Sequence, residues 1–196
     1  IPFVGGDVYA SVVGQDKVFM KDIFEKEKLP MTKYVWFYDC DYKNDSEEVL
    51  KNIKKLKYPL IVKPATTGSS VGIKVADNDD ELIDAIDNAI NYDNKILVEE
   101  VVTNLKEVNI SVLGNYEHQR VSVIEEVISG SKFLTYDEKY ISGNKGKLKG
   151  GMKVPVKGGS KGMASANRKI PADISDKQIK EVEDIKNKYN MDPIDV

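Results

Sequence analysis

The sequence predicts an α+β fold. Helix and strand patterns follow in the order helix, strand, helix, β-hairpin, helix, several strands, a glycine-rich loop and a final helix. There is no strict β-α-β alternation, and neither G-x-x-x-x-G-K-[ST] nor G-x-G-x-x-G occurs in the chain. P-loop and Rossmann folds therefore lose their main support. Helices mixed with antiparallel strands around a hairpin are typical of the α+β class.

The composition excludes several classes of protein. Of 196 residues, 41% are hydrophobic and 31% charged, and the formal net charge is −3, so no basic field favours nucleic acid. No run of about eighteen apolar residues could cross a membrane. The chain has one cysteine, Cys40, and one histidine, His118, which excludes zinc sites and Cys–His catalysis and fits a reducing compartment. We expect a cytoplasmic protein with neither nucleic acid nor membrane as a partner.

Elements in the first third of the chain follow from apolar spacing and cap residues. Asp16–Lys28 has a helical pattern and ends before Pro30, since the position before proline disfavours helix. Thr32–Tyr38 is rich in strand formers, and Asp39–Asp45 is expected to be a polar loop. Ser46 is a good N-cap for the next helix. Its apolar face holds Val49, Leu50, Ile53 and Leu56.

A β-hairpin is predicted over Tyr58–Val75, YPLIVKPATTGSSVGIKV. An apolar run ends in Lys63-Pro64, a loop of small residues follows, and a second extended run begins at Val71. Backbone N–H groups and serine hydroxyls can donate to phosphate oxygens, and Gly68 permits close approach. Loops of this kind are common and most bind nothing, so the rest of the chain has to support the interpretation.

Further elements alternate less regularly in the second half. Asp77–Asp80 caps a helix with apolar residues from Leu82 to Ile90 on one face. Strand patterns follow at Lys95–Val102, Val108–Leu113 and Arg120–Ile128, and Phe133–Ile141 contains the run Tyr136–Tyr140. The segment 142–168 is rich in glycine and lysine, and a loop of such length is usually functional or disordered. Ile170-Pro171-Ala172 restores order, and Ser175 caps the last helix.

Nucleotide binding needs cations for the phosphates, an apolar slot for the base and a carboxylate for the ribose. Lys17, Lys63 and Lys139, each near the end of a regular element, are candidate phosphate ligands. The strand that runs out through Glu99 can present backbone groups to a base, and Glu107 can bind ribose. Each residue has a simpler interpretation, because most lysines are solvated and a strand often ends in acidic residues.

The combination of motifs, in order, resembles the ATP-grasp ligases, and within them the D-alanine–D-alanine ligase family. The resemblance covers about Ile1 to Tyr189. It rests on Ile1–Gly5, Ala10-Ser11, Asp16-Lys17, Tyr58–Pro64, Gly68–Gly72, Leu97–Glu100, Glu107-Val108, Tyr136–Tyr140 and Ile170–Ala172.

The resemblance implies a role for each candidate residue. Lys17 and Lys63 would contact the α- and β-phosphates. Glu99, Val101 and Val102 would bind adenine, and Glu107 the ribose hydroxyls. Ser69 and Ser70 would cover the phosphates, Lys139 would reach the γ-phosphate or the base region, and Tyr140 with Ser69 would hold the closed lid near the first D-alanine.

It also implies domains and a reaction. Residues 1–30 would form a linker and entry helix, 31–102 the central ATP-grasp subdomain with an antiparallel sheet, and 103–196 part of the C-terminal subdomain with its ω-loop at 142–168. ATP would phosphorylate one D-alanine, and the amine of a second amino acid would attack the acyl phosphate, giving the dipeptide used in peptidoglycan.

Two segments of the family are expected outside this chain. They are the N-terminal substrate domain and the acidic Mg²⁺ ligands, which Asp192 and Asp195 do not match. We therefore expect this piece to bind ATP without catalysing alone. The complete protein would be a homodimer formed largely through the missing domain, and the piece a monomer.

Alternatives remain open. One is another ATP-grasp carboxylate–amine ligase, and another is a non-catalytic ATP-binding module. The second substrate, D-alanine, D-serine or D-lactate, is not fixed, although Tyr140 by analogy favours an amino acid.

Overall fold

The computed structural model describes residues 5–115, 117–128, 167–188 and 191–193. The chain divides into two compact units, Ile1–Thr103 and Asn104–Val196. The segment Phe133–Ile141, with the predicted ligands Lys139 and Tyr140, and residues 142–166 of the predicted ω-loop lie outside the described residues. The assignment of 31–102 and 103–196 to two ATP-grasp subdomains stays a prediction.

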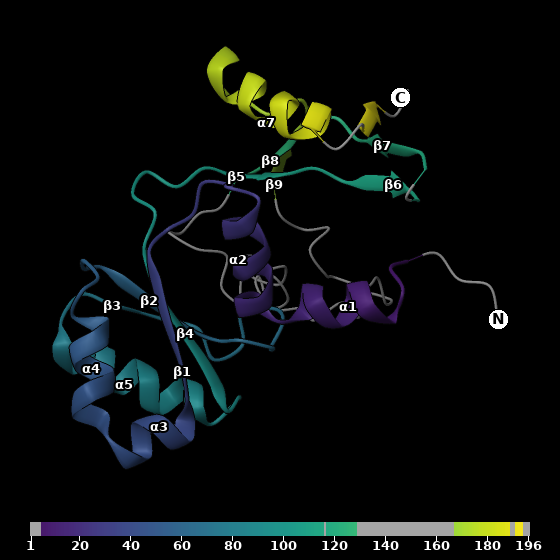
Figure 1. Cartoon of the computed structure of the whole chain (residues 1–196). Coiled ribbons are helices and arrows are strands. Elements are labelled where there is room, and N and C mark those ends of the chain that lie inside the picture. The colour runs from purple at the N-terminus through teal and green to yellow at the C-terminus, as the bar shows by residue number, and fades with distance from the viewer. Residues whose placement is uncertain (1–4, 116, 129–166, 189–190, 194–196) are drawn as a thin grey trace, which may run out of the picture. The chain divides into compact units, whose positions relative to one another are not determined.

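The first unit is a four-stranded antiparallel sheet with helices on both faces, which confirms the α+β class (Figure 1). The strand order is β1-β4-β2-β3. Its strands are β1 Tyr34–Tyr38, β2 Leu60–Pro64, β3 Lys74–Ala76 and β4 Lys95–Glu100. Its helices are α1 Val8–Gln15, α2 Lys17–Lys26, α3 Asp39–Asn44, α4 Ser46–Ile53 and α5 Asp79–Ile90.

Alternation along the strands decides which residues face which helices. Successive side chains of a strand point to opposite faces of the sheet. Leu60 and Val62 of β2, together with Ile96 and Val98 of β4, belong to the core under α4 and α5. Leu97, one position off this pattern, packs instead with Val18 of α2 and with Ala65. The sheet thus has a wholly apolar face and a second face, covered by α2, that can hold polar groups.

Three boundaries differ from the sequence prediction because of local capping. Asp39–Asp45 was predicted to be a loop, which is wrong, since α3 lies there. The N–H of Tyr38 donates to the Asp41 carboxylate at 3.0 Å, and the acidic first turn suits a helix N-terminus. Val8–Gln15 forms an additional helix capped by Asp7, whose carboxylate accepts from the N–H of Ala10 at 2.8 Å. Asp45, rather than the predicted Ser46, caps α4.

The second unit has two small sheets and a helix. Its elements are β5 Glu107–Asn109, β6 Val112–Gly114, β7 Gln119–Val121, β8 Glu125–Ile128, β9 Asn167–Lys169, α7 Asp176–Lys188 and β10 Met191–Pro193. One sheet has the order β10-β7-β6 and the other β5-β8-β9. As predicted, Ser175 caps α7, because its hydroxyl accepts from the N–H of Gln178 at 3.4 Å.

The single strands predicted over Val108–Leu113 and Arg120–Ile128 are wrong, since each is divided between the two sheets. The chain changes sheet where Ser111 and Ser122 meet. The N–H of Ser122 donates to the carbonyl of Ser111 at 2.9 Å, and the N–H of Ser111 donates to the hydroxyl of Ser122 at 2.9 Å. The serine side chain takes over a bond that a regular ladder would make through the backbone. Asn167 and Arg168, predicted to end the ω-loop, lie in β9.

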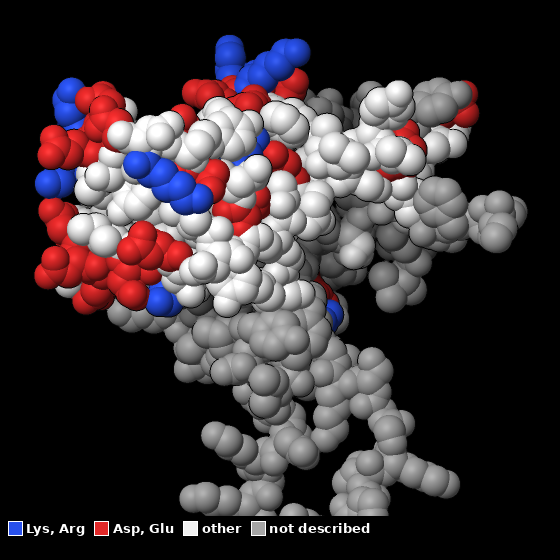
Figure 2. Space-filling view, turned by 90° about the horizontal axis from the view of Figure 1, so that it is seen from below, with Lys and Arg blue, Asp and Glu red and all other residues white. Residues whose placement is uncertain are grey.

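Surface charge is uneven. Figure 2 shows acidic and basic side chains together over the part of the first unit that holds α3, α4 and α5, beside a described surface that is mostly uncharged. The first turn of helix α5 contains three acidic residues, Asp79, Asp80 and Glu81. Among the described residues, no helix is long and apolar enough to span a membrane.

Replacing Ile86 tests the apolar core under α5. Ile86 is 0% exposed, whereas Ile83 on the same helix is 38% exposed. We expect Ile86→Ala to lower the free energy of unfolding by about 2–5 kcal/mol, because a buried cavity adds to the lost transfer energy. The measurement is urea unfolding followed by circular dichroism. The matched control, Ile83→Ala, should cost less than about 1 kcal/mol, and equal losses in both variants would contradict this core.

Candidate functional site

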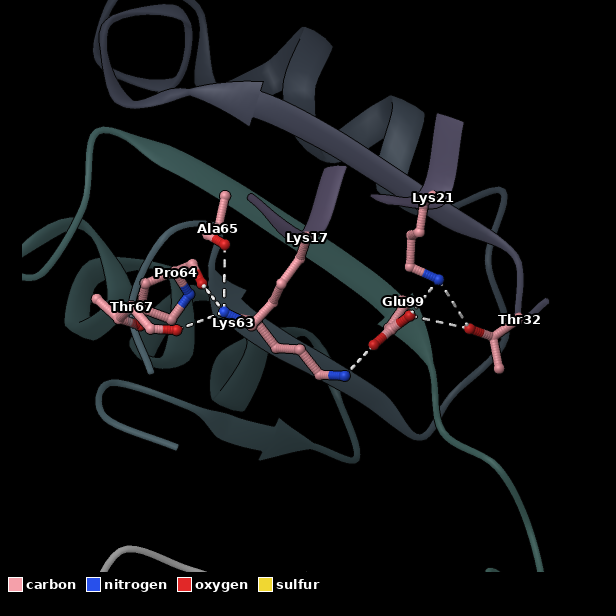
Figure 3. A network of polar contacts seen from close by, with 8 residues as sticks. All are labelled: Lys17, Lys21, Thr32, Lys63, Pro64, Ala65, Thr67 and Glu99. Atoms are coloured by element: carbon pink, nitrogen blue, oxygen red, sulfur yellow. Dashed lines mark hydrogen bonds and ion pairs between the residues drawn. The ribbon is translucent and has the colours of Figure 1, made fainter. Parts of the chain in front are cut away.

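A buried carboxylate and a lysine meet on the α2 face of the sheet. In the antiparallel pairing of β2 with β4, Ile61 stands opposite Glu99 and Lys63 opposite Leu97. Lys63 and Glu99 are therefore diagonal neighbours on one face, within reach of long side chains. The ammonium of Lys63 donates to one carboxylate oxygen of Glu99 (Figure 3). The sequence predicted both residues as ligands, but not that they would bind each other.

The second oxygen of Glu99 is occupied as well. The ammonium of Lys21, from α2, lies 2.6 Å from it, and the hydroxyl of Thr32 donates to it at 2.9 Å (Figure 3). Glu99 is only 6% exposed. Burial alone would raise the pKa of this carboxyl, but Lys63 and Lys21 outweigh burial and hold the pKa below its usual range. Glu99 is thus an anion held between two cations.

Lys17 stands at the first position of α2 and binds the strand end rather than an acid. Its ammonium donates to the carbonyls of Pro64 at 3.0 Å, Ala65 at 3.2 Å and Thr67 at 2.6 Å (Figure 3). Burial lowers the pKa of Lys17, and the nearby charge of Lys63 lowers it further. The ammonium is therefore held where β2 passes into the small-residue loop.

An ion pair that the sequence reasoning missed fixes the start of α2. Asp16 and Lys95 lie 2.8 Å apart and are 7% and 5% exposed. The ammonium of Lys95 also lies 4.2 Å from the ring centroid of Phe19 and 4.9 Å from that of Trp36. The other oxygen of Asp16 caps α2 by accepting from the N–H of Val18 at 2.8 Å. Burial raises the pKa of Asp16, but the bonds from Lys95 and from the helix N–H groups lower it overall.

The loop from Thr66 to Gly72, hereafter the small-residue loop, has a left-handed backbone. Ser69, Ser70 and Gly72 have φ values of 54°, 61° and 73°. The N–H of Val71 donates to the carbonyl of Gly68 at 3.1 Å. Successive left-handed and turn residues expose N–H groups that form anion-binding concavities. The conformation suits the predicted phosphate contact of Ser69 and Ser70, which stays a prediction.

A glycine is required only at the far end of this loop. A Cβ atom on Gly72 would lie 2.6 Å from the Tyr92 ring and 2.7 Å from the Pro64 ring, whereas one on Gly68 would meet nothing within 4 Å. Gly72 therefore lets the loop return tightly against the sheet.

Three other predicted ligands lie at the end of the first unit or in the second unit. Val101 and Val102 directly follow β4, and the N–H of Val101 donates to the carbonyl of Pro59 at 3.0 Å. Val102 is 50% exposed, as the binding of an apolar base would require. Glu107 is the first residue of β5, in the second unit. The roles assigned to these residues stay predictions.

The first-unit cluster contains more lysine than acidic side chains around Glu99. The ammonium groups of Lys21 and Lys63 share the carboxylate of Glu99. Lys17 binds backbone carbonyls, and the charges of Asp93, Asp16 and Glu99 act on it from nearby. The small-residue loop leaves the sheet directly beside Lys17. Among the described residues there is no group of three or more His, Cys, Asp or Glu that could hold a metal ion. We therefore derive no step through Mg²⁺.

The sequence is similar to proteins of known family. Residues 23–161 match the family described as D-ala D-ala ligase C-terminus. A D-alanine–D-alanine ligase from Natranaerobius thermophilus is 43% identical over 149 residues, which is 76% of this chain but 40% of the relative. The chain thus spans well under half the length of this curated relative.

Two solved structures that resemble this chain are also ligases of D-alanine. A D-Ala:D-Ser ligase from Enterococcus faecalis superposes with a TM-score of 0.71 at 26% identity, covering 96% of this chain and 48% of that one. A D-alanine–D-alanine ligase from Helicobacter pylori gives a TM-score of 0.57 at 28% identity, covering 68% of this chain and 41% of that one.

The lowered pKa of Glu99 predicts a pH dependence of stability. Because this pKa is lower in the folded state than in the unfolded chain, the carboxylate stabilises the fold above the unfolded pKa of about 4.3. That contribution is lost as pH falls through the lower folded pKa. Glu99→Gln should therefore be less stable than wild type by about 3 kcal/mol at pH 7, and the gap should shrink toward pH 3.

Urea unfolding of both proteins at pH 7, 5, 4 and 3 measures this gap. Glu48→Gln is the control, because the Glu48–Lys51 pair is 54% and 73% exposed. It should leave the stability nearly unchanged at each of these pH values. A gap between wild type and Glu99→Gln that stays constant with pH would contradict the ion-pair assignment.

Proposed function

This chain belongs to the D-alanine–D-alanine ligase family and has the ATP-grasp fold, and from that premise we propose that it is the nucleotide-binding part of an ATP-dependent ligase. The complete protein would join D-alanine to a second D-amino acid through a peptide bond, for peptidoglycan synthesis. We place this reaction in the cytoplasm, with Mg²⁺ ligands supplied from outside the described residues.

The observation that supports ATP binding most directly is the cluster of Lys17, Lys21 and Lys63 around Glu99. It combines several positive charges, a loop with left-handed residues at Ser69, Ser70 and Gly72, and water-poor surroundings, because Glu99 is 6% exposed. Phosphoryl transfer requires mainly positioning and charge stabilisation, with little covalent work by the protein. Such a cluster supplies both for the phosphates of ATP.

The family implies a reaction in two steps. The carboxylate of the first D-alanine attacks the γ-phosphorus, and ADP leaves. The amine of the second amino acid then attacks the acyl carbon, phosphate leaves, and the amine loses a proton. Lys17 and Lys63 would hold the α- and β-phosphates in line with the acceptor, and Ser69 and Ser70 would cover them. A closed loop also keeps water from the acyl phosphate.

Other residues complete the proposal. Glu99, Val101 and Val102 would border adenine, Glu99 through its backbone while its side chain holds the lysines. Glu107 would bind the ribose hydroxyls. Lys139 would assist at the γ-phosphate or base, and Tyr140 with Ser69 would hold the lid. The complete protein would act on ATP and D-alanine as a homodimer.

A second candidate differs only in the amino acid that attacks. The solved structure from Enterococcus faecalis is a D-Ala:D-Ser ligase, and the superposition covers 96% of the present chain. D-Serine is therefore a candidate second substrate beside D-alanine, and D-lactate should be tested with them.

Lys63→Ala tests the phosphate site. Loss of a charge-assisted contact should weaken ATP binding by about 1.5–3 kcal/mol, or about 10- to 100-fold in Kd. Isothermal titration with ATP and Mg²⁺ gives the affinity. The matched control is Lys74→Ala on the neighbouring strand β3, because Lys74 pairs with Asp84 at the surface and is 43% exposed. Equal ATP affinity in wild type and Lys63→Ala would show that Lys63 is not a phosphate ligand.

Phosphate release by the complete gene product tests the reaction. With ATP, Mg²⁺ and D-alanine we expect release that saturates with D-alanine and a dipeptide product detectable by mass spectrometry. Adding D-serine or D-lactate beside limiting D-alanine would reveal the preferred second substrate. L-Alanine is the control and should give no dipeptide. Release that is independent of every D-amino acid would overturn the ligase assignment and favour a non-catalytic ATP-binding module.

A further inference from the structure

The short segment Pro64–Thr67 joins β2 to the small-residue loop, and its backbone is held from two sides. Its carbonyls face the start of α2: Lys17 binds those of Pro64, Ala65 and Thr67, and the side-chain amide of Gln15 donates to that of Thr66. Its N–H groups point the other way. The N–H of Ala65 donates to the carbonyl of Lys95 at 2.9 Å, and the N–H of Thr66 has a partner from outside the sheet.

Asp93 is that partner. One of its carboxylate oxygens accepts both the N–H of Thr66 at 2.7 Å and the hydroxyl of Thr66 at 2.8 Å. The other oxygen accepts the N–H of Lys95 at 3.1 Å, at the start of β4. A carboxylate can accept several such bonds at once, and bonds to an ionised acceptor are about twice as strong as neutral ones. Asp93 thus ties the loop entrance to the central strand.

The loop exit is tied to the same region. The side-chain amide of Asn88, near the end of α5, donates to the carbonyl of Gly72 at 3.1 Å, and the Tyr92 ring lies against Gly72. The connection from α5 to β4 therefore holds Thr66 at one end of the loop and Gly72 at the other. The residues between these two anchors, from Thr67 to Val71, contain the serines expected to meet phosphate.

We propose that Asp93 is a positioning residue for nucleotide phosphates, acting through Thr66 on the small-residue loop and on the carbonyls that hold Lys17. This inference rests on the proposed function and deepens it. Asp93 does not itself contact phosphate, since its oxygens are engaged by Thr66 and Lys95. Its negative charge also lies near Lys17, where it opposes an incoming anion. The benefit of Asp93 thus comes from geometry and not from charge.

Two substitutions at one position separate these effects. Asp93→Ala removes the anchor and should raise the Kd for ATP about tenfold or more, since Thr66 loses two hydrogen bonds. Asp93→Asn removes the charge and keeps one oxygen for Thr66, although its NH2 group cannot accept from the N–H of Lys95. It should therefore raise the Kd for ATP clearly less than Asp93→Ala does. The Kd for adenosine, which lacks phosphate, should change by less than about twofold in either variant.

The experiment uses isothermal titration of the full chain with ATP and with adenosine, together with thermal unfolding. Asp87→Ala, an exposed acid on α5, is the control and should match wild type in every measurement. Thr66→Val removes only the hydroxyl bond and gives a milder test if Asp93→Ala does not fold. It should raise the Kd for ATP by about two- to fivefold.

The outcomes are distinguishable. Failure of wild type to bind ATP would overturn the proposed function and this inference with it. Wild-type ATP affinity in a folded Asp93→Ala variant would overturn this inference alone. A parallel loss of ATP and adenosine binding with a lowered Tm would also overturn it, because Asp93 would then only support the fold. A loss by Asp93→Asn equal to that by Asp93→Ala would show that the acceptor oxygen kept for Thr66 gives no benefit, and would overturn it too.

Discussion

One buried carboxylate, Glu99, organises the site in the first unit. Removing charges from water costs several kcal/mol for each ion unless partners and hydrogen bonds compensate. Glu99 obtains this compensation from Lys63 on the neighbouring strand and from Lys21 on α2, so its burial requires the helix and the sheet to be in place together. The Asp16–Lys95 pair makes the same connection one turn earlier. Two buried acids thus fix α2 over the sheet and place Lys17 at the entrance of the small-residue loop.

The strand period explains why these charges do not disrupt the core. Leu60 and Val62 point toward α4 and α5, and Lys63 points to the opposite face with Glu99. A shift of register by one residue would exchange the two faces. The packing of the apolar face therefore fixes which side chains lie on the polar face. The alternation of residues along the strands determines both the core packing and the arrangement of charges.

The sequence was sufficient for much of the first unit. Its hairpin, its strands and its main helices followed from apolar period and cap residues, and Lys17, Lys63 and Glu99 were named as candidates from motif order. Lys21, Thr32 and Asp93 were missed, because their importance depends on strand register and on a helix packed across the sheet. The prediction of a loop at Asp39–Asp45 was wrong, because a polar segment resembles a loop even where its side chains cap a short helix. The prediction of single long strands in the second unit was wrong, because the point where a strand changes sheet is set by pairing with strands far away in the sequence.

Gly72 also sets how freely this region can change in evolution or in the laboratory. Any side chain there would meet the rings of Tyr92 and Pro64 and would have to adopt a left-handed backbone, at φ 73°. Gly68 has open space around it, since a Cβ atom at that position would meet nothing within 4 Å. Substitutions should therefore be tolerated at Gly68 and hardly at all at Gly72. A variant without Gly72 would also have to change the packing of Tyr92 and Pro64 to keep the same loop conformation.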